Sequence, residues 1–598
     1  MVFTHSVSAG ASERRSGPTK EDPAEQGSPF GADALNGGAM SAAMERTRDT
    51  VSRTFQIGSA GSADPAGTPG ASERPPRLGG TPSRPDGQAE QATGARVHFL
   101  GIGGSGLAPL ARIALARGDT VSGSDQDVSE RVETLRSLGA RIRTGAVPGP
   151  AQLAAELAEV DVVVASSALP DNHPEIVAAR AAGLPVRRRS DWLPELTADY
   201  RLVAVAGSHG KSTTSAMLTV VLRAAGADPT AVIGAEVPQL GGGALVGGGE
   251  IFVLEADEYG GAFARLDPAL TILTNVEWEH PDLFPDEAAV RAAFTAFAAR
   301  VRPGGTLVAC GDDPGVAAVL GMLAEGPGGG PRVVRYGFGA GLAWRAVDVR
   351  PSREAQPAGD ACSGPADGGE PRAVTEATVL RDGEPVGTLR LALPGRHTVS
   401  NALAVLAVAT ELGVPVVTTL AALAGYTGAA RRFQRIGAAT LPGPAAGDWG
   451  AVEVIDDYAH HPTEIRATLA AARQKAGGRQ VWAVLQPHTY SRLAALLDDF
   501  ADAFGDADRL YVTDIYAARE RDDLGVHASD LAKRVRVPAA TSYVPWPELA
   551  GRLAADLPGQ DVLLLTLGAG TITELGPRLL AALATSWRER ARHGRSPR

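Results

Sequence analysis

Regular alternation of apolar and polar residues begins at Arg96. Residues 96–100 read RVHFL, a short apolar strand that runs into the glycines of GIGGSG. A helical stretch follows at 107–118, and a second strand is expected at 119–125. This order predicts a unit made of a strand, a glycine loop, a helix and a second strand.

Two further regions carry the same kind of pattern. Residues 201–226 again read as strand, glycine loop and helix, about a hundred residues after the first unit. From about residue 429, apolar strands are expected at 452–458, 480–486, 509–516 and 562–570, with helical stretches such as 462–474 between them. The chain therefore predicts two nucleotide-handling α/β domains and a third α/β domain with a parallel sheet.

The length of 598 residues is too great for a single hydrophobic core. We expect an α/β fold of three domains and place their boundaries at 96–198, 199–428 and 429–598. Residues 351–371, PSREAQPAGDACSGPADGGEP, read as a flexible insertion in a β-rich part of the middle domain.

Residues 1–95 are rich in Gly, Ala, Ser, Pro and charge, without a sustained apolar period. Such a segment cannot bury enough surface to offset its ordering entropy, so we expect a disordered tail. The alternatives are a functional tail and a true start at Met40 or Met44.

Composition excludes several classes of function. The net charge of -11 argues against a general nucleic-acid binder, because phosphate backbones favour clustered Lys and Arg. Only Cys310 and Cys362 occur and no basic-then-apolar leader is seen, which indicates the reducing cytoplasm. The longest apolar stretches, such as 402–409, fall short of the roughly 20 residues that a membrane helix needs. We therefore expect no membrane span.

The first glycine loop, residues 101–106, fits the pattern GxGxxG, and Asp125 follows Gly106 by nineteen residues at the end of the next strand. Glycines let the backbone approach a pyrophosphate at a helix N-terminus, and the acid can reach a ribose hydroxyl. The pattern predicts nucleotide binding, with a mere tight turn as the alternative. By itself it would suggest NAD.

The second loop, Gly207 to Thr213, reads GSHGKST and has the spacing GxxGKS. Its backbone N–H groups would cradle phosphates, Lys211 would neutralise β/γ oxygens, and Ser212 would donate its hydroxyl to Mg²⁺. The alternative is a chance glycine-rich turn. Lysine occurs only at positions 20, 211, 475 and 533. Lys211 is one of these few lysines and stands where a phosphate-binding lysine is required. Its position therefore favours ATP binding.

Two acidic patches follow strands of the middle domain. Residues 255–258 read EADE after the strand IFVL, and residues 274–280 read TNVEWEH after the strand LTI. Carboxylates and an imidazole at the carboxyl ends of strands, beside a phosphate loop, are suited to Mg²⁺. A solvated acidic loop is the alternative for each patch.

Two polar motifs follow strands of the third domain, DDYAHHP at 456–462 and QPHTYSR at 486–492. The adjacent His460 and His461 could be metal ligands or bases. A zinc site normally needs three or four protein ligands, however, and no cysteine is at hand. We favour a role in binding substrate and nucleotide.

Ten motifs occur in one order over about residues 96–575: GIGGSG, GSHGKSTT, EADE, TNVEWEH, PGRHTVSNALAV, RRF, DDYAHHPTEI, QPHTYSR, DIYAARE and LGAGTI. Together they resemble the Mur ligases, specifically those that add L-alanine. The resemblance implies a Rossmann-like N-terminal domain that binds UDP, a central P-loop ATPase domain and a Rossmann-like C-terminal α/β domain. It also implies that ATP and Mg²⁺ serve cytoplasmic peptidoglycan precursor synthesis. The lactyl carboxylate of UDP-N-acetylmuramate would become an acyl phosphate, and the amine of L-alanine would then displace phosphate.

The same resemblance implies roles for single residues. The UDP-sugar would be bound by Gly101, Gly103, Gly104, Gly106, Asp125, Ser166 and Ser167. ATP would be bound by Gly207, Ser208, His209, Gly210, Lys211, Ser212, Thr213, His397, Asn401 and Asp457. Magnesium would be bound by Ser212, Glu255 and His280, and the amino acid by Tyr458, His460 and Arg492. The implied catalytic residues are Lys211, Arg432, His460 and Arg492, with Arg432 on the γ-phosphate.

The chain departs from the family pattern at four positions. Glu279, Thr398, Thr489 and Thr571 stand where Asp, Asn, Arg and Asp are common. Some related ligases carboxylate a central lysine to assist magnesium. This device is missing here, because no lysine occurs between 212 and 474.

Three other functions compete with this interpretation. A recycling ligase would join a whole peptide to UDP-N-acetylmuramate, although GIGGSG favours the alanine-adding enzymes. An NAD-dependent dehydrogenase would explain GxGxxG and Asp125 but not Lys211 or the acidic patches. A P-loop switch or motor protein would need neither the first domain nor QPHTYSR.

Overall fold

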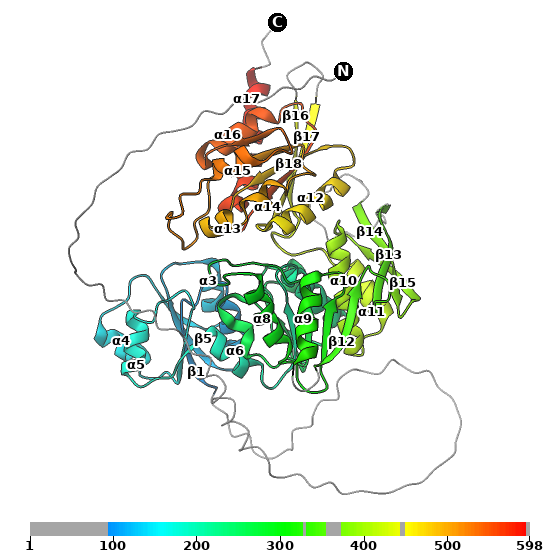
Figure 1. Ribbon diagram of the computed structural model, residues 1–598. Coiled ribbons are helices and arrows are strands. Elements are labelled where there is room, and N and C mark those ends of the chain that lie inside the picture. Colours follow the sequence, from blue (N-terminus) through cyan, green and yellow to red (C-terminus); the bar gives the residue numbers. More distant parts are fainter. Residues whose placement is uncertain (1–93, 327–329, 355–371, 443–448, 594–598) are drawn as a thin grey trace, which may run out of the picture. The chain divides into compact units, whose positions relative to one another are not determined.

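The computed structural model describes residues 94–326, 330–354, 372–442 and 449–593. Three sheets follow one another along the chain (Figure 1). Each lies within one of the ranges 96–198, 199–428 and 429–598, which remain our proposal for the domain boundaries. The tail expected at 1–95 falls outside the described residues except for its last two.

The first sheet is fully parallel and has the order β3-β2-β1-β4-β5. Its strands are β1 (Arg96–Leu100), β2 (Thr120–Asp125), β3 (Arg141–Thr144), β4 (Val162–Ala165) and β5 (Val186–Arg188). The helices are α2 (Ala108–Ala116), α3 (Glu130–Ser137), α4 (Pro150–Leu157), α5 (Pro174–Ala181) and α6 (Arg189–Thr197). The order reverses between β1 and β4, so the first glycine loop lies at the crevice where α/β sheets bind ligands.

The central sheet has ten strands in the order β15-β14-β13-β12-β11-β10-β6-β9-β7-β8. These are β6 (Arg201–Ala206), β7 (Thr230–Val232), β8 (Ala244–Leu245), β9 (Ile251–Glu255), β10 (Leu270–Leu273), β11 (Thr306–Cys310), β12 (Arg332–Gly337), β13 (Trp344–Glu354), β14 (Arg372–Arg381) and β15 (Glu384–Leu391). The helical elements are α7 (Lys211–Ala224), η1 (Pro238–Leu240), η2 (Tyr259–Arg265), α8 (Glu287–Ala298), α9 (Pro314–Glu325), α10 (Arg396–Glu411) and α11 (Val416–Ala424).

The predicted insertion at 351–371 was placed too early. Residues 351–354 belong to β13, which pairs antiparallel with β14. The proline and charge of this stretch are compatible with a strand near the edge of the sheet, where few ladder hydrogen bonds are lost. The rest of the expected insertion, 355–371, lies outside the described residues, and so does Cys362.

The third sheet has the order β16-β17-β21-β18-β19-β20. Its strands are β16 (Gln434–Pro442), β17 (Trp449–Asp457), β18 (Gln480–Leu485), β19 (Arg509–Val512), β20 (Thr541–Tyr543) and β21 (Val562–Leu567). The helical elements are α12 (Pro462–Ala476), α13 (Tyr490–Ala495), α14 (Leu497–Ala501), α15 (Ala528–Arg534), α16 (Trp546–Asp556), η3 (Thr571–Glu574) and α17 (Leu575–His593). The expected parallel sheet is confirmed for five strands, but β16 pairs antiparallel with β17.

Strand β6 shows why the central sheet needs helices on both faces. Val203 and Val205 belong to one apolar core with α7 and α10, whereas Leu202 and Ala204 belong to another with α8 and α9. Because side chains alternate along a strand, a continuous apolar run fills both faces. The phosphate loop after β6 is thus held on a strand that is buried on both sides.

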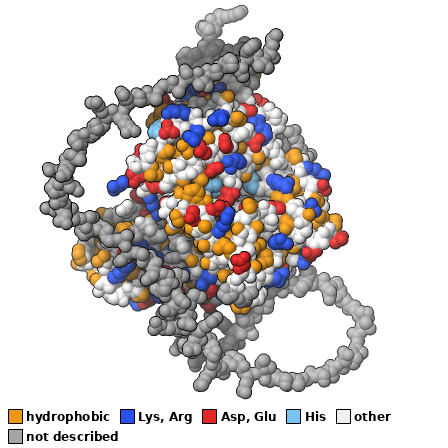
Figure 2. Space-filling view, viewed as in Figure 1, with side chains coloured by type: hydrophobic (Ala, Val, Ile, Leu, Met, Phe, Trp, Pro, Cys, Tyr) orange, Lys and Arg blue, Asp and Glu red, His pale blue; other side chains and the backbone are white. Residues whose placement is uncertain are grey.

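Surface charge bears on nucleic-acid binding, and helix length bears on membrane spanning. Basic and acidic side chains are interspersed on the face shown in Figure 2, so an anionic substrate depends on local sites. In the described ranges no helix combines the length and the apolar character that crossing a membrane requires.

Candidate functional site

The second glycine loop connects β6 to α7. Gly207 has a φ of 135°, and a Cβ there would lie 2.0 Å from Thr274 Oγ1, so only glycine fits. The N-cap of α7 is Gly210, also left-handed with a φ of 81°. In the described parts of the chain, the amides of residues 210–213 have no backbone acceptor. Free amides at a helix N-terminus form a site for phosphate oxygens.

Lys211 is fixed at the start of α7. Its Nζ donates to the carbonyl of Gly207 at 2.7 Å and lies 2.9 Å from Glu258 Oε2. Burial alone would lower the pKa of Lys211, but Glu258 and Asp257 raise it. Burial alone would raise the pKa of Glu258, but Lys211 and His280 lower it to about 2. The ammonium group is therefore charged and oriented before any phosphate arrives.

Ser212 is the next residue after Lys211, and it contacts Glu255 at the end of β9. Its hydroxyl donates to Glu255 Oε1 at 2.8 Å, and the other oxygen of Glu255 accepts from the amide of Gly234. Arg432 Nη2 lies 3.3 Å from the same hydroxyl. A hydroxyl and a carboxylate oxygen are ligands that Mg²⁺ accepts, so these two residues fit the predicted magnesium site.

The third predicted magnesium ligand, His280, lies in a neighbouring group. Its Nε2 is 3.6 Å from Glu258 Oε1, and ligand atoms of Asp257, Glu258 and His280 all lie within 4.8 Å of one another. His280 has a φ of 56°, an uncommon conformation outside glycine. Both acidic patches of the sequence therefore meet beside Lys211, with Asp257 and Glu258 as further oxygen donors.

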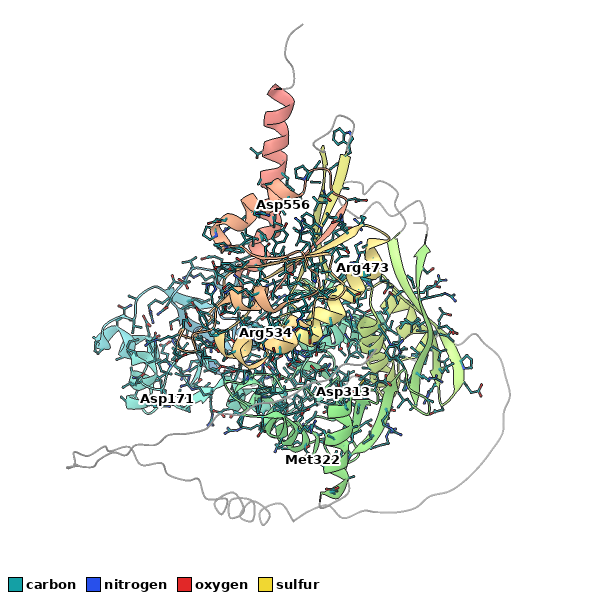
Figure 3. All side chains as sticks on the ribbon, turned by 45° about the horizontal axis from the view of Figure 1, so that its top comes forward. Asp171, Asp313, Met322, Arg473, Arg534 and Asp556 are labelled. Atoms are coloured by element: carbon teal, nitrogen blue, oxygen red, sulfur yellow. The ribbon has the colours of Figure 1, made fainter. Side chains whose placement is uncertain are left out.

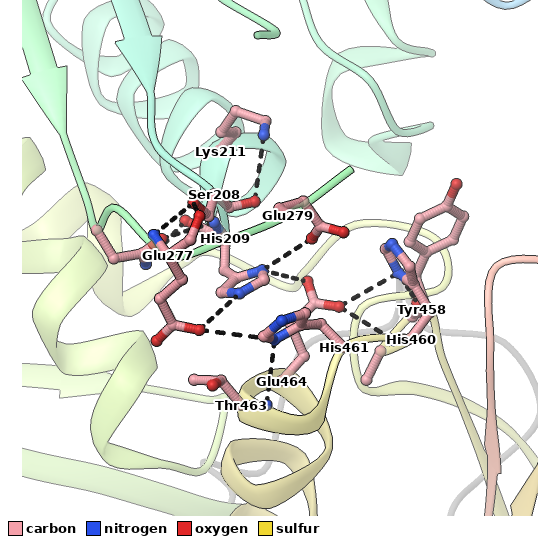
Figure 4. A network of polar contacts seen from close by, with 12 residues as sticks. Ser208, His209, Lys211, Glu277, Glu279, Tyr458, His460, His461, Thr463 and Glu464 are labelled. Atoms are coloured by element: carbon pink, nitrogen blue, oxygen red, sulfur yellow. Dashed lines mark hydrogen bonds and ion pairs between the residues drawn. The ribbon is translucent and has the colours of Figure 1, made fainter. Parts of the chain in front are cut away.

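His209, in the second loop, is surrounded by carboxylates (Figure 4). Its Nε2 lies 3.3 Å from Glu277 Oε2, and its Nδ1 lies 3.3 Å from Glu464 Oε1. Burial alone would lower the pKa of His209, but Glu464 and Glu277 raise it to about 10. The imidazole is therefore positively charged and ties the phosphate loop to α12.

His461 stacks at a tilt on His209, with ring centroids 4.7 Å apart. Its Nδ1 lies 3.6 Å from Glu277 and accepts from the amide of Thr463. Burial and the charge of His209 lower the pKa of His461. His209, Glu277 and His461 form a second group of ligand atoms within 4.8 Å. Because His209 carries a proton on this ring, a cation could bind the group only by displacing that proton.

His460 has a different environment from that of its neighbour. Its Nδ1 lies 3.0 Å from the carbonyl of Tyr458 and 3.2 Å from Glu464. Burial lowers the pKa of His460 to about 4, so the ring is neutral at pH 7. The neutral ring can accept a hydrogen bond from an amine, but a pKa of about 4 makes it a weak base at pH 7. The ring of Tyr458 stands edge-on to it at 5.2 Å.

Arg492, predicted to hold the amino acid, is buried in an ion pair. Its Nε donates to Glu279 Oε1 at 2.9 Å, and its Nη1 lies 2.9 Å from His488 Nδ1. Burial alone would raise the pKa of Glu279, but Arg492 holds it well below its usual range. Part of the guanidinium is thus engaged by the protein itself, and Glu279 is the residue that departs from the family pattern.

The other three residues predicted to bind ATP come from two elements, α10 and β17. A Cβ on Gly210 would lie 2.9 Å from Asn401 Oδ1, which places α10 against the phosphate loop. His397 begins the same helix, and burial lowers its pKa to about 4. Asp457, at the end of β17, accepts from the amide of Phe433 at 2.7 Å, and burial raises its pKa to about 6. Asn401 is thus the one of the three whose contact with the loop is seen, while Asp457 is held by Phe433 and Ala459.

The first glycine loop turns at Gly101, which has a φ of 77°. Asp125 does not point away from the loop, because its Oδ2 accepts from the amide of Gly103 at 2.8 Å. Gly104 donates to the carbonyl of Gly101, and a Cβ on Gly101 would lie 3.2 Å from Ser166 Cβ. Asp125 and Ser166 therefore shape the loop.

Ser166 and Ser167 follow β4, beside the loop. The hydroxyl of Ser166 accepts from the amide of Ala168 at 3.2 Å, and its carbonyl accepts from Arg188. Ser167 lies in the turn after it. The structure thus brings the first set of predicted residues together around β1 and β4.

Sequence reasoning missed the side chains that hold the predicted ones. Glu258 orients Lys211, and Glu464 contacts both His209 and His460. Glu464 could have been found from its spacing, since it follows His460 by four residues at the start of a helix. Arg189 beside Gly106 carried no such signal.

Fold and site define an α/β enzyme that uses a nucleotide, with a phosphate loop on its central sheet and a second glycine loop on its first. Comparison with known families narrows this class. The family model "Mur ligase family, catalytic domain" matches residues 96–201, "Mur ligase middle domain" matches 205–409, and "Mur ligase, glutamate ligase domain" matches 431–570. The chain belongs to the Mur ligase family and is an ATP-dependent, amide-forming ligase.

Individual relatives point to one branch of the family. The chain is 67% identical to UDP-N-acetylmuramate–L-alanine ligase of Frankia casuarinae, over 82% of this chain and 98% of the relative. It is 44% identical to the protein of the same name from Kineococcus radiotolerans, over 82% and 96%. Among solved structures, UDP-N-acetylmuramate–alanine ligase of Thermotoga maritima is 27% identical, with a TM-score of 0.62 over 82% and 99%. A murein peptide ligase of Psychrobacter arcticus shares the fold, at 24% identity and a TM-score of 0.56 over 82% and 99%.

Proposed function

We propose that this chain joins L-alanine to the lactyl carboxylate of UDP-N-acetylmuramate, using ATP and Mg²⁺, in cytoplasmic peptidoglycan precursor synthesis. The observation that carries the proposal is the preset phosphate site, in which Lys211 is held by Glu258 beside the pair Ser212–Glu255. The proposed substrates are those for which relatives up to 67% identical are named.

The reaction needs an activated carboxylate, because a carboxylate itself is a poor acylating agent. The lactyl oxygen attacks the γ-phosphorus of ATP, ADP leaves, and an acyl phosphate forms. Such a transfer depends on positioning and on neutralised charge, more than on a protein nucleophile. Lys211, the residue before Ser212, and Arg432, whose Nη2 lies 3.3 Å from the Ser212 hydroxyl, supply fixed positive charge for the transferred group.

Bound Mg²⁺ would be held by Ser212 and Glu255, with Asp257, Glu258 and His280 beside them, and would neutralise phosphate charge. In the second half of the reaction the amine attacks the acyl carbon and phosphate leaves. The amine must first lose a proton. We assign His460, whose imidazole is neutral, to steer the amine or accept its proton, with a structural histidine packed under Tyr458 as the alternative. We assign Arg492 to bind the carboxylate of L-alanine.

The alternative is a recycling ligase that joins a peptide to the same sugar nucleotide. Purified protein should be given ATP, Mg²⁺, UDP-N-acetylmuramate and, in turn, L-alanine, other amino acids or L-alanyl-D-glutamyl peptides, and phosphate release should be measured. We expect release with L-alanine. Phosphate release only with a peptide would favour the recycling reaction. If none of the acceptors gave phosphate release, amide formation would be refuted.

A further inference from the structure

Arg189 has no hydrogen-bond or ion-pair partner among the described residues, although burial there disfavours its charge. It is the first residue of α6, and its Nε is a buried atom without a hydrogen bond. Among the residues that the structure describes, no acceptor and no carboxylate within 4.0 Å pairs with its guanidinium. Burial lowers the pKa of Arg189, and Asp257 and Glu255 oppose that effect without contacting it. A guanidinium stays charged in proteins, and a buried charge without a partner is unfavourable. An anion bound beside Arg189 would therefore be stabilised.

Its neighbour in sequence shows what a structural arginine looks like here. Arg188 donates to the carbonyls of Ser166 and Leu169, each at 2.8 Å, and to Asp171, which is labelled in Figure 3. Every one of these contacts braces the loop after β4. Arg189 has no comparable role, since its contacts are apolar ones made by its stem.

The stem of Arg189 packs on the first glycine loop. A Cβ on Gly106 would lie 3.3 Å from Arg189 Cδ and 3.5 Å from its Nε. Glycine at position 106 therefore leaves room for the arginine as much as for the backbone turn. This contact places the guanidinium beside the N-terminal end of α2.

The loop itself offers donors at the same point. The amides of Gly101, Ile102, Gly103 and Gly104 are used within the loop or by β2. The amides of Ser105 and Gly106, in contrast, have no acceptor in the described part of the chain. Two free amides and an unpaired guanidinium converge where α2 begins, which is a donor set suited to phosphate oxygens.

We propose that Arg189 binds the diphosphate of the sugar-nucleotide substrate, together with the amides of Ser105 and Gly106. The inference rests on the proposed function, because that function supplies the sugar nucleotide. It adds a side-chain cation to a site that was assigned only to glycines, Asp125 and two serines. Because Glu255 and Asp257 are near enough to act on the charge of Arg189, the sugar's lactyl group can extend from the diphosphate toward the magnesium ligands.

The test is direct binding without ATP, measured by calorimetry on the full chain. Titrants are UDP-N-acetylmuramate, UDP-N-acetylglucosamine, UDP and uridine. Arg189→Ala should weaken the first three by about ten- to a hundredfold, as expected for losing a charged hydrogen-bond pair, and leave uridine unchanged. Arg189→Lys should recover part of the loss, and ATP affinity should not change.

Two further variants keep the outcome interpretable. Arg187→Ala removes an exposed guanidinium on the same segment, paired only with Glu195 at 3.4 Å, and should bind like the wild type. Gly106→Ala keeps Arg189 but pushes on its stem, and should also weaken UDP. Circular dichroism and the thermal midpoint check that each variant folds.

Three results would overturn the inference. An equal loss for uridine would mean a structural role, and a loss confined to UDP-N-acetylmuramate would place Arg189 on the lactyl carboxylate. Unchanged UDP binding in Arg189→Ala would remove it from the site. The proposed function fails separately: wild-type protein that binds UDP but releases no phosphate with L-alanine would refute the ligation and leave the Arg189 result standing. Wild-type protein that binds no uridine nucleotide would overturn both.

Discussion

Arg492 and Glu279 form a buried ion pair across 213 residues of sequence, with Nε 2.9 Å from Oε1 and each side chain 4% exposed. Arg492 lies on α13 and Glu279 in the loop after β10, so the pair joins the third sheet's helices to the central sheet's acidic patch. An uncompensated charge at such a depth is costly.

Breaking this pair from one side should lower stability more than removing both charges. We expect Arg492→Ala to cost about 3–5 kcal/mol, because Glu279 would remain buried and unpaired. The double variant Arg492→Ala with Glu279→Gln should recover part of that loss. Thermal midpoints of the two single variants and the double variant give the coupling. Fully additive losses would show that the two side chains do not interact in solution.

Lys211→Ala should abolish ATP-dependent ligation. The γ-phosphate would lose its nearest fixed positive charge, and removal of one such group typically costs roughly 10²-fold or more. UDP-N-acetylmuramate binding should survive, since the first glycine loop lies on another sheet. Phosphate release and sugar-nucleotide titration measure the two effects. Lys533→Ala is the matched control, because Lys533 is 74% exposed on α15. Near-normal turnover of the Lys211 variant would contradict the assignment.

Sequence patterns located the two glycine loops, and the structure bears out their setting between strand and helix. A strand that runs into glycines and then a helix is a local signal, because the three elements follow one another directly in the sequence. The same holds for Ser212, whose place after Lys211 fixes its position on α7. What it contacts is not local: Glu255 reaches it from β9.

Long-range ion pairs could not be predicted. Glu464 contacts His209 only because α12 packs against the phosphate loop, and Arg492 meets Glu279 only because α13 approaches the acidic patch. Neither spacing nor residue type reveals such packing. The antiparallel edge strand β16 was missed for a similar reason, since its run of alanine, glycine and threonine lacks a strong apolar period.

Stability should fall as pH rises from neutrality, through His209. Its folded pKa of about 10 exceeds the ordinary value of 6.5. The stabilisation is thus fully present below about pH 6.5 and is lost as pH rises toward 10, by up to about 1.4 kcal/mol per pH unit. His209→Asn should flatten this slope. Thermal midpoints of both proteins at pH 6, 7, 8 and 9 decide it. Parallel curves would mean that His209 is not charged in the folded protein.

Deleting residues 1–90 should leave both ligation and thermal midpoint nearly unchanged. The segment's composition gives it no periodic apolar face, so we expect it to contribute nothing to a core. Calorimetry and phosphate release on the truncated and full chains provide the comparison. A fall of many degrees in the midpoint would show that the tail packs on the folded part.

The last prediction concerns how L-alanine is held. Thr489 stands where the family often has arginine, so we propose Arg492 as the main group that binds the carboxylate. Of its five donors, Nε and one Nη2 hydrogen are directed to Glu279, while Nη1 lies 2.9 Å from His488 Nδ1 and 3.4 Å from the His488 carbonyl. Among the described residues, the second Nη2 hydrogen therefore has no acceptor.

That hydrogen can donate to a carboxylate oxygen, so the ion pair with Glu279 can orient Arg492 without blocking it. Arg492→Ala should therefore raise the KM for L-alanine far more than that for ATP or UDP-N-acetylmuramate, by about 2–4 kcal/mol when converted to free energy. Thr489→Arg in the Arg492→Ala background should restore part of the alanine affinity by returning a cation to the site. Steady-state kinetics with each substrate varied in turn is the measurement. If all three KM values rise together, Arg492 serves only as the partner of Glu279, and another group must bind the amino acid.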